Sequence, residues 1–231
     1  LYIGEGRDSK FFRSFMPPAS ITNCGGYESV IDLTREIVAD GKEHTFTINF
    51  PLYHDVYELY VGLKEGSTIL KAPDYSVKVP MVFYGSSVTQ GGCASRPGTC
   101  YQAYLSRWFD ADYINLGFSG NGKAEDEMIE YLAGLEMAAF VSDYDHNAPN
   151  AEHLLKTHEK LYREIRKKHP DLWALLLKWD ADSPVTFKPD GHTVHDFDER
   201  FALEDQGLIT PSDPWKWSYL TDRPLQLKMI F

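Results

Sequence analysis

The sequence has few cysteines and no long apolar run. Its three cysteines, Cys24, Cys93 and Cys100, are too few for a disulfide-rich scaffold, and their odd number leaves at least one thiol unpaired. Because Cys93 and Cys100 flank a short loop, they either pair with each other or remain free thiols. No stretch approaches the ~20 apolar residues of a membrane span, so we expect no membrane-spanning segment.

Positive charge is also scarce. The 231-residue chain carries 23 Lys and Arg against 34 Asp and Glu, which gives a formal net charge of −11. Proteins that bind nucleic acid normally present a basic surface to the phosphates, so the composition argues against a nucleic-acid partner. The chain begins at Leu1 without the basic and apolar segments of a signal peptide, and its compartment stays open.

Two kinds of ligand site are not indicated. The glycine-rich segments are not followed by Gly-Lys-Ser or Gly-Lys-Thr, so they do not match a phosphate-binding loop. Asp143, Asp145 and His146 carry metal-binding side chains, but neighbours on an extended strand point to opposite faces and do not converge easily. We therefore expect neither a metal nor another cofactor.

The first 78 residues are predicted to form a small β-rich domain. In residues 44–50 apolar and polar side chains alternate, which is typical of a half-buried strand. A second alternating run covers residues 55–63, and turn-forming Pro and Asp residues lie between the two runs. We interpret this region as an antiparallel sheet or sandwich, joined by residues 71–80 to a second domain over 79–231.

The second domain alternates strand and helix patterns. Strands are predicted at 81–84, 112–116, 138–143 and 173–177, with helices between them. The first helix is expected to bury the face made by Tyr101, Tyr104, Leu105, Trp108 and Phe109. This alternation favours an α/β fold, in which helices cover both faces of a parallel sheet. The alternation is lost after about residue 178.

Polar segments follow three of the predicted strands, at residues 85–92, 117–123 and 143–150. Ligands of parallel α/β sheets bind beyond the carboxyl ends of the strands. A serine there acts as a nucleophile if a base accepts its proton and N–H groups hold the oxyanion. Ordinary turns that close the sheet explain the same residues, so composition alone leaves both interpretations open.

Three sequence blocks resemble the SGNH/GDSL hydrolases. GSSVTQG (Gly85–Gly91) resembles their first block, INLGFSGNG (Ile114–Gly122) resembles their second, and DYDHN (Asp143–Asn147) occupies the place of their third. The branch with an N-terminal β-sandwich is more similar still, since INFPLYHDVYELYVG looks like the end of that accessory domain. The resemblance covers roughly residues 44–171 and implies a three-layer α/β/α, flavodoxin-like fold.

The resemblance also implies a serine esterase that needs no cofactor. Ser87, and not Ser86, takes the place of the nucleophile. The backbone N–H groups of Ser87 and Gly120 and the side-chain amide of Asn147 take the places of the oxyanion donors, although His146 replaces the glycine usual before that asparagine. The substrates implied are small-molecule or carbohydrate esters of acetyl or other short acyl groups; oligomeric state is not indicated.

The general base does not follow the family pattern, which is Asp-x-x-His near the C-terminus. Here Asp190 precedes His192 by two residues and His195 by five. In one hypothesis His195 and Asp190 form a displaced pair. In a second, His192 or His146 acts as the base. In a third, the chain lacks the pair and is a carbohydrate-binding protein that keeps the fold without catalysis.

Overall fold

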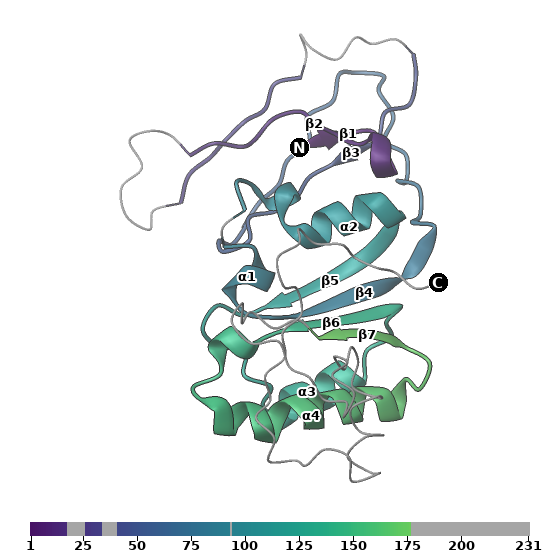
Figure 1. Cartoon of the computed structure of the whole chain (residues 1–231). Helices are drawn as coiled ribbons and strands as arrows, with labels where there is room; N and C mark the ends of the chain where they lie inside the picture. Colours follow the sequence, from purple (N-terminus) through teal and green to yellow (C-terminus); the bar gives the residue numbers. More distant parts are fainter. Residues whose placement is uncertain (18–25, 34–40, 93, 177–231) are drawn as a thin grey trace, which may run out of the picture.

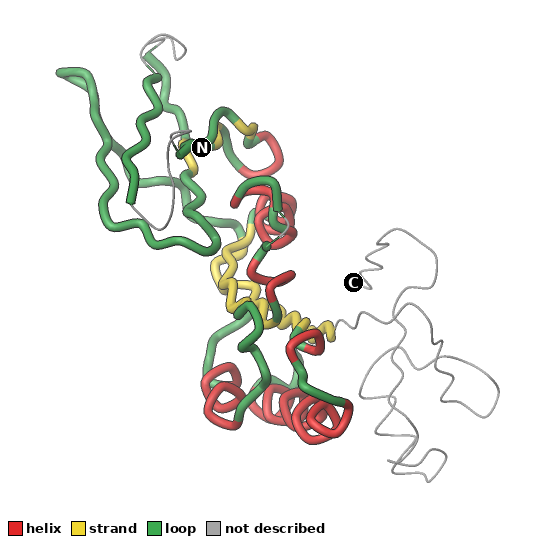
Figure 2. The backbone as a smooth tube through the Cα atoms, turned by 90° about the vertical axis from the view of Figure 1, so that its left-hand side faces the viewer, coloured by secondary structure: helices red, strands yellow, loops and turns green. Residues whose placement is uncertain are grey.

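A computed structural model of the chain describes residues 1–17, 26–33, 41–92 and 94–176. These residues form a four-stranded parallel sheet and a smaller antiparallel sheet of three short strands (Figure 1). Helices cover both faces of the parallel sheet (Figures 1 and 2). The predicted α/β class with a small N-terminal β-rich region is therefore confirmed.

The parallel sheet contains all four predicted strands. They are β4 (Val77–Gly85), β5 (Ala111–Gly117), β6 (Ala139–Asp143) and β7 (Trp173–Leu176). Their spatial order is β5-β4-β6-β7, with every neighbouring pair parallel. Because the chain crosses from β5 to the other side of β4, the order reverses beside β4, where open α/β sheets bind their ligands.

The helices divide between the two faces of the sheet. The short helix α1 (Ser87–Gln90) and α2 (Tyr101–Phe109) lie on one face, and α3 (Asp126–Ala133) and α4 (Ala151–Lys168) lie on the other (Figure 1). Single turns of 3-10 helix are η1 (Gly6–Asp8), η2 (Pro97–Thr99) and η3 (Asp145–Asn147). The described segments contain no helix long and apolar enough to cross a bilayer.

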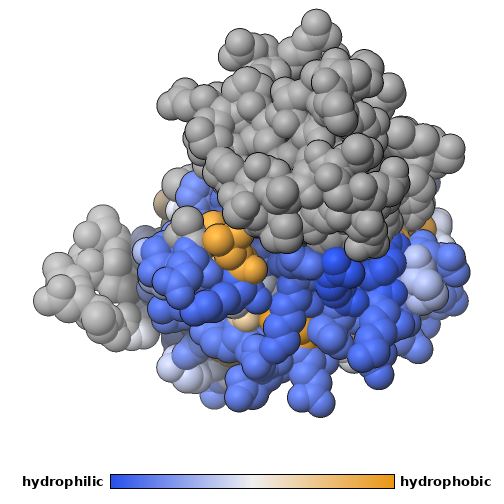
Figure 3. All heavy atoms as spheres, turned by 60° about the horizontal axis from the view of Figure 1, so that its bottom comes forward, coloured by the Kyte–Doolittle hydropathy of each residue, from blue (hydrophilic) through white to orange (hydrophobic). Residues whose placement is uncertain are grey.

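The main core lies between the sheet and the pair α3 and α4. Ile129 and Leu132 of α3 pack with Leu161 and Ile165 of α4 against Phe140 of β6, and all five side chains are buried. Burial of such side chains contributes ~1.5–3 kcal/mol each. The outer face of these two helices, brought forward in Figure 3, is mainly hydrophilic.

Helix α2 is present as predicted, but it buries a different face. The exposed fractions of Tyr104 and Trp108 are 49% and 59%, whereas Gln102, Ala103 and Ser106 are buried. Small side chains let the helix lie close to β5, and the Ser106 hydroxyl donates a hydrogen bond to the Ala111 carbonyl. The apolar periodicity was misleading because each of the two buried polar side chains donates a hydrogen bond to a backbone carbonyl inside the fold.

The N-terminal sheet is smaller than the sequence indicates. It contains β1 (Tyr2–Ile3), β2 (Lys10–Phe11) and β3 (Phe46–Thr47) in the order β2-β1-β3. The prediction of a strand over residues 55–63 is wrong, since that described segment is irregular and Tyr57 and Tyr60 are 88% and 81% exposed. An alternating pattern becomes a strand only where another strand offers backbone partners, and the described residues offer none there.

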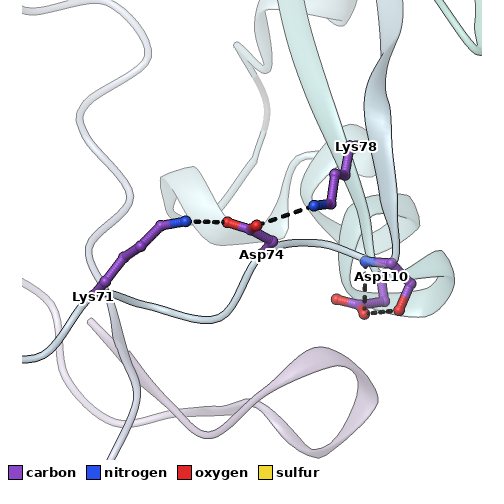
Figure 4. A network of polar contacts seen from close by, with 5 residues as sticks. Lys71, Asp74, Lys78 and Asp110 are labelled. Atoms are coloured by element: carbon purple, nitrogen blue, oxygen red, sulfur yellow. Dashed lines mark hydrogen bonds and ion pairs between the residues drawn. The ribbon is translucent and has the colours of Figure 1, made fainter.

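A network of polar contacts lies around the first residues of β4 (Figure 4). The Asp74 carboxylate lies 2.6 Å from the Lys71 ammonium and 3.1 Å from the Lys78 ammonium. The backbone N–H of Ser76 donates to Asp110 Oδ2 at 3.1 Å, and its hydroxyl donates to the same oxygen. The start of β4 is thereby held against the turn between α2 and β5.

Candidate active site

The register of the sheet brings the three polar segments to one place. Gly85 at the end of β4 pairs with Gly117 at the end of β5 and with Asp143 at the end of β6. The three loops therefore begin side by side at one edge of the sheet, on either side of the point where the strand order reverses. The predicted convergence of these segments is observed.

Two glycines allow α1 to lie directly on the strand ends. A Cβ atom at Gly117 would clash with the backbone of Gln90, and one at Gly85 would clash with the Thr89 hydroxyl and the Asp143 carbonyl. Glycine avoids these clashes because it has no Cβ. The close approach places the first turn of α1 against the loop after β5.

The structure distinguishes the two adjacent serines. Ser86 is completely buried, and its side chain caps α1 by accepting a hydrogen bond from the Val88 N–H at 3.2 Å. Ser87 is the first residue of α1 and is half-buried. The N–H of a first helical residue has no partner within its own helix, so it is suited to bind an anion.

Gly120 and Asn147 are in direct contact. Gly120 has a left-handed backbone with φ of 73°, and its N–H donates to Asn147 Oδ1 at 3.2 Å. Asn147, the last residue of η3, donates from Nδ2 to the Phe118 carbonyl at 2.8 Å. A bound oxyanion has to draw the Gly120 N–H away from Asn147, whereas the Asn147 amide has a second N–H to offer.

A buried network below α1 was not found from the sequence. Thr89 is fully buried, and its carbonyl accepts hydrogen bonds from Gln102 and from Asn115. Its hydroxyl donates to Asp143 Oδ2 at 3.2 Å and accepts from the Tyr101 hydroxyl at 3.3 Å. These contacts lock the helix that begins with the candidate nucleophile. The sequence signal was the presence of polar residues inside otherwise apolar elements.

Asp143 has an unusual environment for a carboxylic acid. It is 1% exposed, and within the described residues its Oδ1 atom has no hydrogen-bond partner. Burial, followed by the nearby Asp145 carboxylate, raises its pKa to about 6, while the Thr89 hydroxyl and His146 act in the opposite direction. The buried carboxyl therefore stays protonated to a higher pH than an exposed aspartic acid does.

This pKa shift predicts a pH-dependent stability. Because the folded state binds the Asp143 proton more tightly than the unfolded state, stability falls as pH rises from about 4 to about 6. Asp143→Asn keeps an acceptor for Thr89 and cannot ionise, so its free energy of unfolding relative to wild type should rise by about 2–3 kcal/mol between pH 4 and pH 7.5. Urea unfolding at both pH values measures this, and an equal difference at both would contradict it.

Asp143, Asp145 and His146 converge in the structure, so the expectation that they do not is wrong. One ligand atom from each residue lies within 4.8 Å of the others. The reason is that β6 ends at Asp143 and the next residues turn into η3 instead of continuing as a strand. Acidic groups commonly gather without an ion, so the cluster by itself does not indicate a bound ion.

Asp190, His192 and His195 lie outside the described residues, so the structure does not test the predicted base. His146 is described and exposed. Cys93 also lies outside the described residues, and Cys100 is a buried free thiol whose pKa is raised by burial.

The sequence matches one family model and parts of several solved structures. The GDSL-like lipase/acylhydrolase family model matches residues 78–200, which is more than half of the chain. A GDSL-like lipase from Bacteroides ovatus ATCC 8483 is 41% identical over 43% of this chain and 29% of its own, with a TM-score of 0.41. A two-domain esterase active on acetylated mannans is 29% identical over 42% of this chain and 29% of its own, with a TM-score of 0.36.

The match to these structures is partial in both directions. This chain spans less than a third of the length of either one, since 29% of each is covered. No curated protein matches the sequence.

Proposed function

Because this chain belongs to the GDSL-like lipase/acylhydrolase family, we propose that it is a serine esterase acting on short acyl esters. Membership of this family supports an enzyme that hydrolyses esters. The identity of the nucleophile and the class of substrate are our proposal. Ser87 is the proposed nucleophile. Gly120, Asn147 and the Ser87 backbone are the proposed oxyanion donors.

One observation carries this proposal. The half-buried Ser87 stands at the start of α1, and the paired strand ends put the loops of Gly120 and Asn147 beside it. Nucleophilic catalysis requires a serine hydroxyl open to the substrate with N–H donors nearby. Ser86 does not fit this role, because its hydroxyl is buried and is used as a helix cap.

The proposed reaction has two halves. Ser87 Oγ attacks the ester carbonyl while a general base accepts the hydroxyl proton, and the carbonyl oxygen becomes an oxyanion. Collapse of this intermediate breaks the bond to the alcohol, which leaves with the proton from the base. Water then attacks the acyl-enzyme while the base accepts a proton from it. The bond between the acyl carbon and Ser87 Oγ breaks, the base returns the proton to Oγ, and the carboxylic acid is released. We propose His195 as the base and Asp190 as the carboxylate that orients it.

Two of the proposed oxyanion donors, Gly120 and Asn147, lie on the loops that follow β5 and β6. In the free enzyme the Gly120 N–H donates to Asn147 Oδ1, and a bound oxyanion would replace that acceptor. N–H donors at the oxyanion stabilise the developing charge, and one such donor contributes ~10²–10³-fold to kcat. The proposed substrates are acetyl or other short-chain esters, with carbohydrate esters among them.

Hydrolysis of p-nitrophenyl esters tests the proposed function. The purified chain should release p-nitrophenol faster than buffer alone, and faster from the acetate than from the octanoate. Release of acetate from an acetylated oligosaccharide tests the carbohydrate part separately. No hydrolysis above the buffer rate for any ester would favour the non-catalytic carbohydrate-binding alternative.

A further inference from the structure

Gln90, the last residue of α1, links three segments at the candidate site. Its side-chain Oε1 accepts a hydrogen bond from the Ser119 N–H at 2.9 Å. Its Nε2 donates to the Leu52 carbonyl at 2.9 Å. Both ends of one amide are therefore engaged, one by the loop after β5 and the other by the N-terminal region.

The N-terminal region also contacts the turn after the candidate nucleophile. The Tyr53 hydroxyl donates to the Ser87 carbonyl at 3.3 Å. A Cβ atom at Gly91 would meet Leu52 Cδ1 at 2.5 Å, and one at Gly92 would meet the Tyr53 hydroxyl at 2.6 Å. The consecutive glycines Gly91 and Gly92 thus let the side chains of Leu52 and Tyr53 pack directly against the turn that ends α1.

The loop after β5 is held from two sides at consecutive residues. Gln90 holds the Ser119 N–H, and Asn147 holds the Gly120 N–H. When an oxyanion takes the Gly120 N–H, the contact between Gly120 and Asn147 is weakened. The hydrogen bond from the Ser119 N–H to Gln90 then still ties the loop to α1, because the substrate oxyanion binds the Gly120 N–H and not the Ser119 N–H.

From this arrangement we infer that Gln90 is a positioning residue, which fixes the Gly120 N–H relative to Ser87 during acylation. The inference rests on the proposed function. Gln90 does not touch the substrate and acts through the Ser119 backbone. Its hydrogen bond to the Leu52 carbonyl ties the N-terminal segment to the same side chain. Its hydrogen bond to the Ser119 N–H is the one that affects the reaction rate.

Two substitutions separate the two bonds of Gln90. Gln90→Met has nearly the same length and makes neither hydrogen bond. Gln90→Glu keeps an acceptor for the Ser119 N–H and, when ionised, cannot donate to the Leu52 carbonyl. The measurements are kcat and KM for p-nitrophenyl acetate at pH 7.5, with circular dichroism and the unfolding temperature to show that each variant is folded.

The expected result is a selective loss of kcat. Gln90→Met should lower kcat by about 10–100-fold, as for a small misplacement of a catalytic group, and leave KM within about 3-fold. Gln90→Glu should keep kcat within about 3-fold of wild type, because the bond to Ser119 is restored. If only the fold depended on Gln90, both variants would melt earlier and kcat would be unchanged.

The outcomes that overturn the inference are distinct from those that overturn the proposed function. A Gln90→Met kcat equal to that of wild type, or an equal kcat loss in folded Gln90→Glu, would overturn the positioning role while leaving the esterase intact. If Gln90→Met does not fold, the kcat of Gln90→Glu is the test. A value within about 3-fold of wild type supports the inference, and a larger loss overturns it. Wild type no faster than Ser87→Ala would instead overturn the proposed function.

Discussion

Replacing Ser87 by alanine is expected to lower kcat for p-nitrophenyl acetate by about 10⁴-fold or more, because the attacking oxygen is removed. Ser87 is half-buried at the first position of α1, so removal of its hydroxyl leaves no buried group without a partner. The free energy of unfolding should therefore stay close to that of wild type. Steady-state kinetics together with urea unfolding separate the loss of chemistry from a loss of fold.

The matched control is Ser86→Ala. This change removes the cap on the Val88 N–H, which costs about 1 kcal/mol of stability for a typical helix cap. Its kcat should remain within about 10-fold of wild type, since a cap acts on the helix and not on the reacting bond. The opposite pattern, with an active Ser87→Ala and an inactive Ser86→Ala, would show that the nucleophile is misassigned.

Replacing His195 by alanine is expected to have the second largest effect. If His195 is the base, kcat should fall by about 10⁴-fold or more, as it does when the base of a serine hydrolase is removed. Asp190→Ala should cause a smaller loss, because the carboxylate orients the base and does not accept the serine proton. Ester hydrolysis by the two variants, at saturating substrate, measures both effects.

His192→Ala and His146→Ala are the controls for this assignment. Both should keep kcat within about 3-fold of wild type if neither one is the base. Added imidazole should restore part of the activity of His195→Ala and leave the two controls unchanged. A large loss in either control with an active His195→Ala would move the base to that residue. Activity in all three variants would place the base elsewhere.

The parallel sheet could be predicted because its signals are local. Strands β4 and β7 contain continuous apolar runs, and each of the helices α3 and α4 has one apolar face. The buried face of α2 was missed because Gln102 and Ser106 are polar, and only their tertiary hydrogen bonds make burial favourable. The strand expected over residues 55–63 failed for the same kind of reason, since strand formation depends on a partner that local alternation does not report.

Part of the candidate site could likewise be predicted from the sequence, and part could not. The segments around Ser87, Gly120 and Asn147 could be located because each follows a strand, and parallel strands end at one edge. The links from Gln90 to Leu52 and Ser119 join residues 38 and 29 positions apart, so no local spacing marks them. The base remains a prediction from the resemblance, because a displaced Asp and His leave no diagnostic spacing.

The most direct test of the account is to identify the serine that reacts with a serine-directed phosphonate. The folded chain is incubated with the reagent, digested and analysed by tandem mass spectrometry, with Ser87→Ala treated in parallel. We predict a single stoichiometric adduct on Ser87 that is absent from Ser87→Ala and whose formation parallels the loss of ester hydrolysis. An adduct on Ser86, or continued hydrolysis with Ser87 unlabelled, would contradict the assignment of Ser87 as the nucleophile.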